Sequence, residues 1–318
     1  MKKLKKGDHI RVVSPSSSIQ SIGGFDANVR AKEKLEELSF NVSFSSNYFE
    51  HDLFDSASIA SRVEDLHEAF LDPSVDAILA TIGGFNCNEL LPYLNYDLIA
   101  QNPKIICGYS DTTALLNAIY AKTGIQTYMG PSYSSFKMKE GQEYQSQSWL
   151  KAVTQDDYDL VPSKEWSSDP WYDPTKPRHF MPTEWKVYKA GKASGIAIGG
   201  NLSTFALLRG TPYAPQVENY VLFVEEAEGY PPEHFLREFA ALLQAYPNPQ
   251  AVIIGRFPKE CEMTEEILLA ILDKHPLLKT IPVLYDVDFA HTQPLFTITI
   301  GGQVTLDTEK MVIHVQTK

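Results

Sequence analysis

Residues 104–124, KIICGYSDTTALLNAIYAKTG, predict a buried strand, a tight turn and a helix in direct succession. The apolar run at 105–107 is typical of a strand covered on both faces. The apolar periodicity after residue 112 indicates a helix that ends at Gly124. A strand followed at once by a helix is the repeating unit of a parallel α/β sheet. The turn between them carries Ser110.

The same alternation extends through the first half of the chain, and the second half is richer in strands. We expect strands at 9–15, 75–84, 184–191, 193–200, 219–226, 250–257, 282–289, 295–302 and 310–316, and helices at 25–40, 58–72, 88–94, 201–210, 232–246 and 263–275. The stretch FTITIGGQVTL, residues 296–306, predicts a hairpin around Gly301-Gly302. The predicted fold class is α/β, with an N-terminal parallel-sheet domain flanked by helices and a mixed, β-rich C-terminal domain.

The segment 161–183 separates these two parts. It holds five prolines and two tryptophans, so we expect neither helix nor strand in it. The predicted organisation is therefore an N-terminal domain at 1–160, a linker or active-site loop at 161–183, and a C-terminal domain at 184–318.

Composition limits the possible partners. The chain of 318 residues has a net charge of −12 and a pI of about 5.1, which argues against a nucleic-acid partner. No uncharged apolar run is long enough for a membrane helix, and we expect no membrane partner. Three scattered cysteines fit a reducing compartment, and we expect a cytoplasmic protein. No HExxH motif or cysteine–histidine cluster predicts a metal site, and no glycine-rich motif predicts a cofactor.

Ser110 has two possible roles on its turn. It could be a nucleophile lifted clear of the sheet, with the backbone N–H of Asp111 as an oxyanion donor. It could equally be a helix cap. The glycines of ATIGGFNCNELL, residues 80–91, would let the backbone of Gly84 approach a ligand and supply a second donor. Alternatively, they form only a tight turn before a helix capped by Asn86.

A serine nucleophile needs a base and a carboxylate that orients it. His291 lies in a predicted loop between two strands, followed by Pro294. The strand at 219–226 ends in Glu225-Glu226, where a carboxylate could be held rigidly or could simply be solvated.

Six segments taken in order make the chain resemble the LD-carboxypeptidase family of serine peptidases, in the branch similar to the microcin C immunity peptidase. They are RVVSPSSS (11–18), TIGGFNCNELLPYLNYDLI (81–99), KIICGYSDTTALLNAI (104–119), GIAIGGNLSTFALLRGT (195–211), VLFVEEAEGYPPEHFLREFAAL (221–242) and FAHTQPLFTITIGGQVTLD (289–307). The resemblance covers nearly the whole chain and implies a homodimer.

The resemblance implies a role for each candidate. Ser110 matches the nucleophile, His291 the general base and Glu225 the orienting carboxylate. The backbone N–H groups of Gly84 and Asp111 match the oxyanion hole. The family shows a glutamate followed by an aspartate where this chain has Glu225-Glu226, so the choice between the two rests on the motif.

Two substrate classes follow from the resemblance. One is the amide that joins an aspartyl residue to a nucleotide in microcin C-like antibiotics, and the other is the L,D bond before a terminal D-alanine in murein peptides. We expect the first, because Trp171, or alternatively Trp166, could stack on an adenine. The rings could instead only pin the segment to the rest of the protein. Asn201, in the fourth matched segment, is a further substrate-binding candidate. A non-catalytic module that binds a small molecule at the sheet edge is the rival hypothesis.

Overall fold

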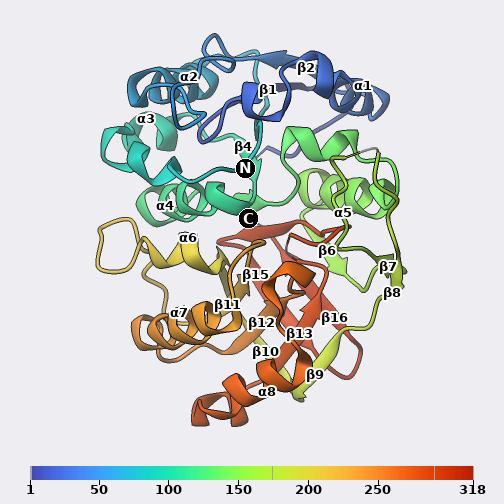
Figure 1. The fold of residues 1–318 in the computed structure, drawn as a ribbon. Helices are drawn as coiled ribbons and strands as arrows, with labels where there is room; N and C mark the ends of the chain where they lie inside the picture. The colour runs from blue at the N-terminus through green and yellow to red at the C-terminus, as the bar shows by residue number, and fades with distance from the viewer. Residues whose placement is uncertain (1, 174, 290, 318) are drawn as a thin grey trace.

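The computed structural model describes residues 2–173, 175–289 and 291–317. It contains two large sheets, with the N-terminal half of the chain around one and the C-terminal half around the other (Figure 1). No helix of the described residues has the length and apolar character needed to cross a bilayer.

The first sheet has the order β14-β5-β4-β3-β1-β2. Its strands are β1 (His9–Val13), β2 (Asn41–Phe44), β3 (Ala77–Ala80), β4 (Ile105–Gly108), β5 (Thr127–Met129) and β14 (Ile298–Ile300). The neighbours from β2 to β5 are parallel, and β14 adds an antiparallel edge. Strands β3, β4 and β5 are buried throughout, as expected for a parallel sheet covered on both faces.

The second sheet has the order β6-β16-β15-β10-β11-β12-β13-β9. Its strands are β6 (Asp157–Leu160), β9 (Lys186–Lys189), β10 (Lys192–Asn201), β11 (Tyr220–Glu225), β12 (Ala251–Gly255), β13 (Val283–Val287), β15 (Gln303–Asp307) and β16 (Val312–Gln316). Strands β10 to β13 are parallel to one another, and the outer strands are antiparallel. The predicted α/β class, with a parallel N-terminal sheet and a β-rich C-terminal part, is confirmed.

Helices connect the parallel strands. The α-helices are α1 (Val29–Glu37), α2 (Ile59–Leu71), α3 (Tyr96–Gln101), α4 (Thr113–Thr123), α5 (Gln142–Thr154), α6 (Leu202–Ala206), α7 (Pro232–Ala245) and α8 (Glu265–Asp273). The 3-10 turns are η1 (Ile19–Ile22), η2 (Asp26–Asn28), η3 (Cys87–Tyr93), η4 (Ser110–Thr112), η5 (Tyr133–Lys137), η6 (Lys259–Cys261) and η7 (Pro276–Lys279). Helix α4 is buried along most of its length and contacts both halves, through β5 and through α6 and β10.

Two local predictions were wrong. The stretch around Gly301-Gly302 is not a hairpin, because β14 pairs with β5 in the first sheet while β15 pairs with β10 and β16 in the second. A Cβ added at Gly301 would lie 2.3 Å from the ring of Tyr120, so the tight crossing needs a glycine there. The segment 161–183 does hold strands, a short ladder of β7 (Glu165–Trp166) with β8 (Met181–Pro182).

That segment is attached closely to the second half of the chain. Ser167 and Gln293 exchange two backbone hydrogen bonds, of 2.8 and 3.0 Å. The buried carboxylate of Asp288 accepts hydrogen bonds from the backbone N–H and hydroxyl of Ser163 and from the indole of Trp185. It also pairs with the buried guanidinium of Arg256 at 3.1 Å. Asp288 and Gln293 flank the loop of His291, so the segment and that loop form one connected layer.

Candidate active site

Ser110 occupies the turn between β4 and α4 in a strained backbone conformation. Its φ is 62°, in the left-handed region that residues with a Cβ rarely adopt. Such a turn projects the side chain away from the sheet, as in the nucleophile elbow of other serine hydrolases. The N-cap residues of η4 and α4, Tyr109 and Thr112, form no side-chain capping hydrogen bond, and Ser110 caps neither element. The capping alternative is therefore not what the structure shows.

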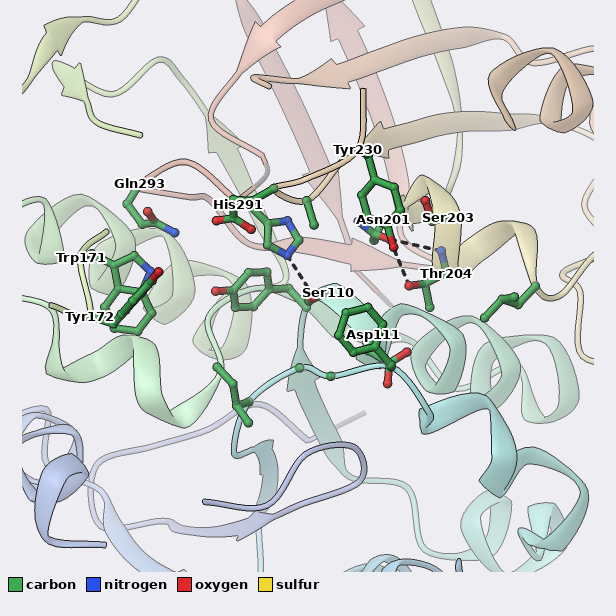
Figure 2. Close-up of a pocket in the computed structure, with 18 residues that line it drawn as sticks. Ser110, Asp111, Trp171, Tyr172, Asn201, Ser203, Thr204, Tyr230, His291 and Gln293 are labelled. Carbon is green, nitrogen blue, oxygen red and sulfur yellow. Dashed lines mark hydrogen bonds between the residues drawn. The ribbon is translucent and has the colours of Figure 1, made fainter. Parts of the chain in front are cut away.

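The hydroxyl of Ser110 instead forms a hydrogen-bonded chain with His291 and Glu225. Nε2 of His291 lies 2.9 Å from Oγ of Ser110, and Nδ1 lies 2.7 Å from Oε2 of Glu225 (Figure 2 draws the Ser110–His291 bond). Ser110 comes from the first sheet, while Glu225 ends β11 in the second and His291 follows β13. The geometry suits an Nδ1–H donated to Glu225 and an Nε2 that receives the serine proton.

The two adjacent glutamates, at the end of β11 and directly after it, face in different directions. Both oxygens of Glu226 lie 3.1 Å from the hydroxyl of Ser203, and Glu226 lies 3.8 Å from Nδ1 of His234. Burial, together with repulsion from Glu225, raises the pKa of Glu226 to about 8. The structure thus brings Glu225, and not Glu226, to His291.

The surroundings of His291 control its protonation. Burial lowers the pKa of the imidazole, but the negative charges of Glu225, Glu228 and Glu226 outweigh this and raise it to about 9. The hydrogen bond to Glu225 acts in the same direction. The imidazole therefore accepts a proton readily. It is neutral only at a pH above the range in which an ordinary histidine loses its proton.

Glycines give the backbone access to Ser110. A Cβ added at Gly83 would lie 2.9 Å from Oγ of Ser110 and 3.6 Å from the backbone N of Asp111. Gly84 has a φ of 154° and packs against Ser16 and Ser17. The carboxylate of Asp111 accepts hydrogen bonds from the backbone N–H of Cys87, at 2.8 Å, and from the hydroxyl of Ser16. The two candidate oxyanion donors, Gly84 and Asp111, therefore line the same pocket as Ser110.

The pocket around Ser110 has a volume of about 480 Å³, in the range of small-molecule sites. Trp171 and Tyr172 lie on one side of it, and Asn201, Ser203 and Thr204 lie on the other (Figure 2). No group of three His, Cys, Asp or Glu side chains among the described residues is arranged to hold a metal ion.

Asn201 is prepared to donate a hydrogen bond. Its Oδ1 accepts from the backbone N–H and the hydroxyl of Thr204, at 3.1 and 3.0 Å. Its Nδ2 is buried and has no hydrogen-bond partner among the described residues. An unpaired buried donor is costly, so a bound molecule that supplies an acceptor would be favoured.

Three tryptophans in or near the segment 161–183 have different surroundings. Trp171 lines the pocket, whereas Trp166 does not and has its ring 4.4 Å from the guanidinium carbon of Arg256. Trp185 is buried and donates to Asp288. The lining residues that sequence reasoning did not single out include Tyr172, Glu228 and Tyr230. Tyr172 adjoins Trp171, and the other two follow the strand end that carries Glu225, so proximity in sequence was the available signal.

Comparison with known proteins places the chain in a family. The family models of the LD-carboxypeptidase N-terminal domain and C-terminal domain match residues 10–130 and 194–306. A Bacillus subtilis protein, YocD, named provisionally as a carboxypeptidase, is 44% identical over 96% of this chain and 95% of its own. The microcin C7 self-immunity protein MccF of Escherichia coli is 31% identical over 98% of this chain and 94% of its own.

Solved structures agree with the sequence matches. The crystal structure of an MccF-like protein from Bacillus anthracis has a TM-score of 0.95 and 44% identity, over 100% of this chain and 99% of that one. MccF in complex with aspartyl sulfamoyl adenosine has a TM-score of 0.90 and 31% identity, over 99% and 98% of the two chains. The chain therefore belongs to the LD-carboxypeptidase family, and it is a serine-type carboxypeptidase.

Proposed function

We propose that Ser110, His291 and Glu225 form the catalytic triad of this enzyme, and that the substrate is a small aminoacyl or peptidyl nucleotide cleaved at its acyl–nitrogen bond. The observation that carries the proposal is the continuous chain of hydrogen bonds from Ser110 through His291 to Glu225. It joins a strained serine to a buried carboxylate across the two halves of the molecule.

The reaction follows from this geometry. Oγ of Ser110 attacks the carbonyl carbon as Nε2 of His291 takes its proton. The carbonyl oxygen of the substrate gains negative charge and is stabilised by the backbone N–H groups of Gly84 and Asp111. Collapse of this intermediate breaks the bond to nitrogen, and His291 gives the proton to the leaving group. Water, activated by the same imidazole, then frees the acyl group from Ser110.

The aromatic side of the pocket supports a nucleotide as one half of the substrate. Trp171 offers a flat ring near the triad, and stacking of a base on such a ring contributes about 1–3 kcal/mol. The MccF structures with aspartyl sulfamoyl adenosine and glutamyl sulfamoyl guanosine support this substrate class. A murein tetrapeptide with a terminal D-alanine is the second candidate, since the family is that of the LD-carboxypeptidases.

Two measurements test the proposal. Ser110→Ala should abolish turnover with the fold retained, and adding His291→Ala should cost little more, because triad residues act as a unit. Full additivity of the two losses would contradict the triad. Hydrolysis of an aspartyl sulfamoyl adenosine should exceed that of the tetrapeptide, and the reverse order would assign the enzyme to murein peptides.

Two further expectations from the sequence stay predictions. They are a cytoplasmic location and a homodimeric assembly. Light scattering of the purified protein tests the second directly.

A further inference from the structure

Glu228 lies where two cavities meet. It follows β11 by three residues and lines both the pocket around Ser110 and an adjoining one. The two cavities also share Trp171, Tyr172, His291 and Gln293. Glu228 is exposed, and its charge acts on the imidazole of His291, so a carboxylate stands within electrostatic reach of the reacting atoms.

This carboxylate has no ion-pair or hydrogen-bond partner among the described residues. The basic side chains that line the adjoining cavity are already paired elsewhere. Lys259 and His179 lie 2.5 and 3.1 Å from the carboxylate of Asp169. Lys176 lies 3.5 Å from Asp173. Glu228 therefore has neither an ion pair nor a hydrogen bond within the described residues, and its carboxylate is free to contact whatever enters the pocket.

The other charged and polar groups of the Ser110 pocket also favour a ligand with a positively charged group. Among its described lining residues there is no lysine or arginine, and the carboxylate of Asp111 is held by Ser16 and Cys87. In the same pocket, the buried Nδ2 of Asn201 is free to donate (Figure 2). The site thus offers an acceptor for a cation at Glu228 and a donor for a neutral or anionic oxygen at Asn201.

We propose that Glu228 binds the free α-ammonium group of the substrate's acyl residue, and that this contact makes the enzyme favour aminoacyl over peptidyl nucleotides, in which that nitrogen is part of a peptide bond. The inference rests on the proposed function. An aminoacyl group carries its ammonium on the carbon next to the carbonyl that Ser110 would attack. A carboxylate close to His291 is therefore suitably placed to receive it.

The experiment compares aspartyl sulfamoyl adenosine with its N-acetyl derivative. Wild-type enzyme, Glu228→Gln and the control Glu233→Gln are assayed for KM and kcat on both. Glu233 is an exposed acid in the first turn of α7 and lines neither cavity. Loss of one charged hydrogen bond should raise the KM of Glu228→Gln for the free amine by about tenfold. Its KM for the acetylated compound, and both constants of Glu233→Gln, should stay within twofold of wild type.

Four outcomes would count against the proposal. An equal rise of KM on both compounds, or no rise on either, would overturn the assignment of Glu228 and leave the triad intact. An equal rise in Glu233→Gln would reduce the effect to overall charge and also overturn it. Failure of wild-type enzyme to cleave either compound would overturn the proposed nucleotide substrate, and the Glu228 assignment with it.

Discussion

Replacing Glu225 by glutamine should separate the roles of the two adjacent glutamates. Glutamine keeps the length of the side chain but removes the charge that lies 2.7 Å from Nδ1 of His291. It can also present an N–H to that nitrogen, which favours the wrong tautomer of the imidazole. In the serine-protease triad, the matching loss of carboxylate charge lowers kcat by about 10⁴-fold. We expect Glu225→Gln to lose about 10³- to 10⁴-fold in kcat.

The same change should alter the dependence of the rate on pH. In the wild type the pKa of His291 is about 9, and its neutral form is the one that can take a proton. The rate should therefore rise with pH and level off only near pH 9. Without the charge of Glu225, burial still lowers the pKa of the imidazole and only Glu228 and Glu226 remain to raise it, so the rising limb should move to lower pH.

Glu226→Gln is the matched control. Glu226 is as buried as its neighbour, but it pairs with Ser203 and not with His291, so it does not orient the imidazole. Glutamine keeps an oxygen that can accept from Ser203, and we expect less than about a tenfold loss of kcat. The assay is kcat/KM between pH 5 and 10, with thermal unfolding as a check on folding. A larger loss in Glu226→Gln, or an unmoved limb in Glu225→Gln, would refute the reasoning.

Three further substitutions test other parts of the site. Trp171→Ala should raise KM for an adenylate about tenfold and leave a ring-free amide unchanged, with Trp166→Ala as control; equal effects on both substrates would make the ring structural. Gly83→Ala should lower kcat at least about a hundredfold, because the added methyl would lie 2.8 Å from Cβ of Ser110; unchanged kcat would show that the turn can adjust. Asp288→Asn should cost about 3 kcal/mol in the free energy of unfolding, since Arg256 would stay buried without its counter-charge; denaturant unfolding measures this, and a change below about 1 kcal/mol would contradict it.

The fold class could be predicted from the sequence because it depends on local patterns of apolar residues. Apolar runs such as 105–107 and the periodicity of α4 identify buried strands and helices without any knowledge of their neighbours. The failure at Gly301-Gly302 has a physical reason. Alternation and a glycine pair specify a turn between two strands, but the choice of sheet for each strand is made by partners far away in the chain, β5 for one and β10 for the other.

The residues of the candidate site could also be predicted in part from the sequence. Ser110, His291 and Glu225 could be singled out by motif, and the structure brings them together. Periodicity cannot say which face of β11 points to the histidine loop, so Glu226 could be set aside only with its bond to Ser203 in view. In the sequence, Trp166 and Trp171 are equally good candidates for a stacking ring. Only the tertiary structure shows that Trp166 packs on Arg256 and that Trp171 lines the pocket.

The exchange of edge strands between the two sheets limits how this protein could be recombined. Strand β14 comes late in the chain yet closes the first sheet, and β6 comes before residue 161 yet closes the second. A chimaera that joined residues 1–160 of this chain to the remainder of a relative would therefore leave each sheet with a foreign edge strand. Functional shuffling between relatives would have to carry β14 with β5, and β6 with β16, as matched pairs.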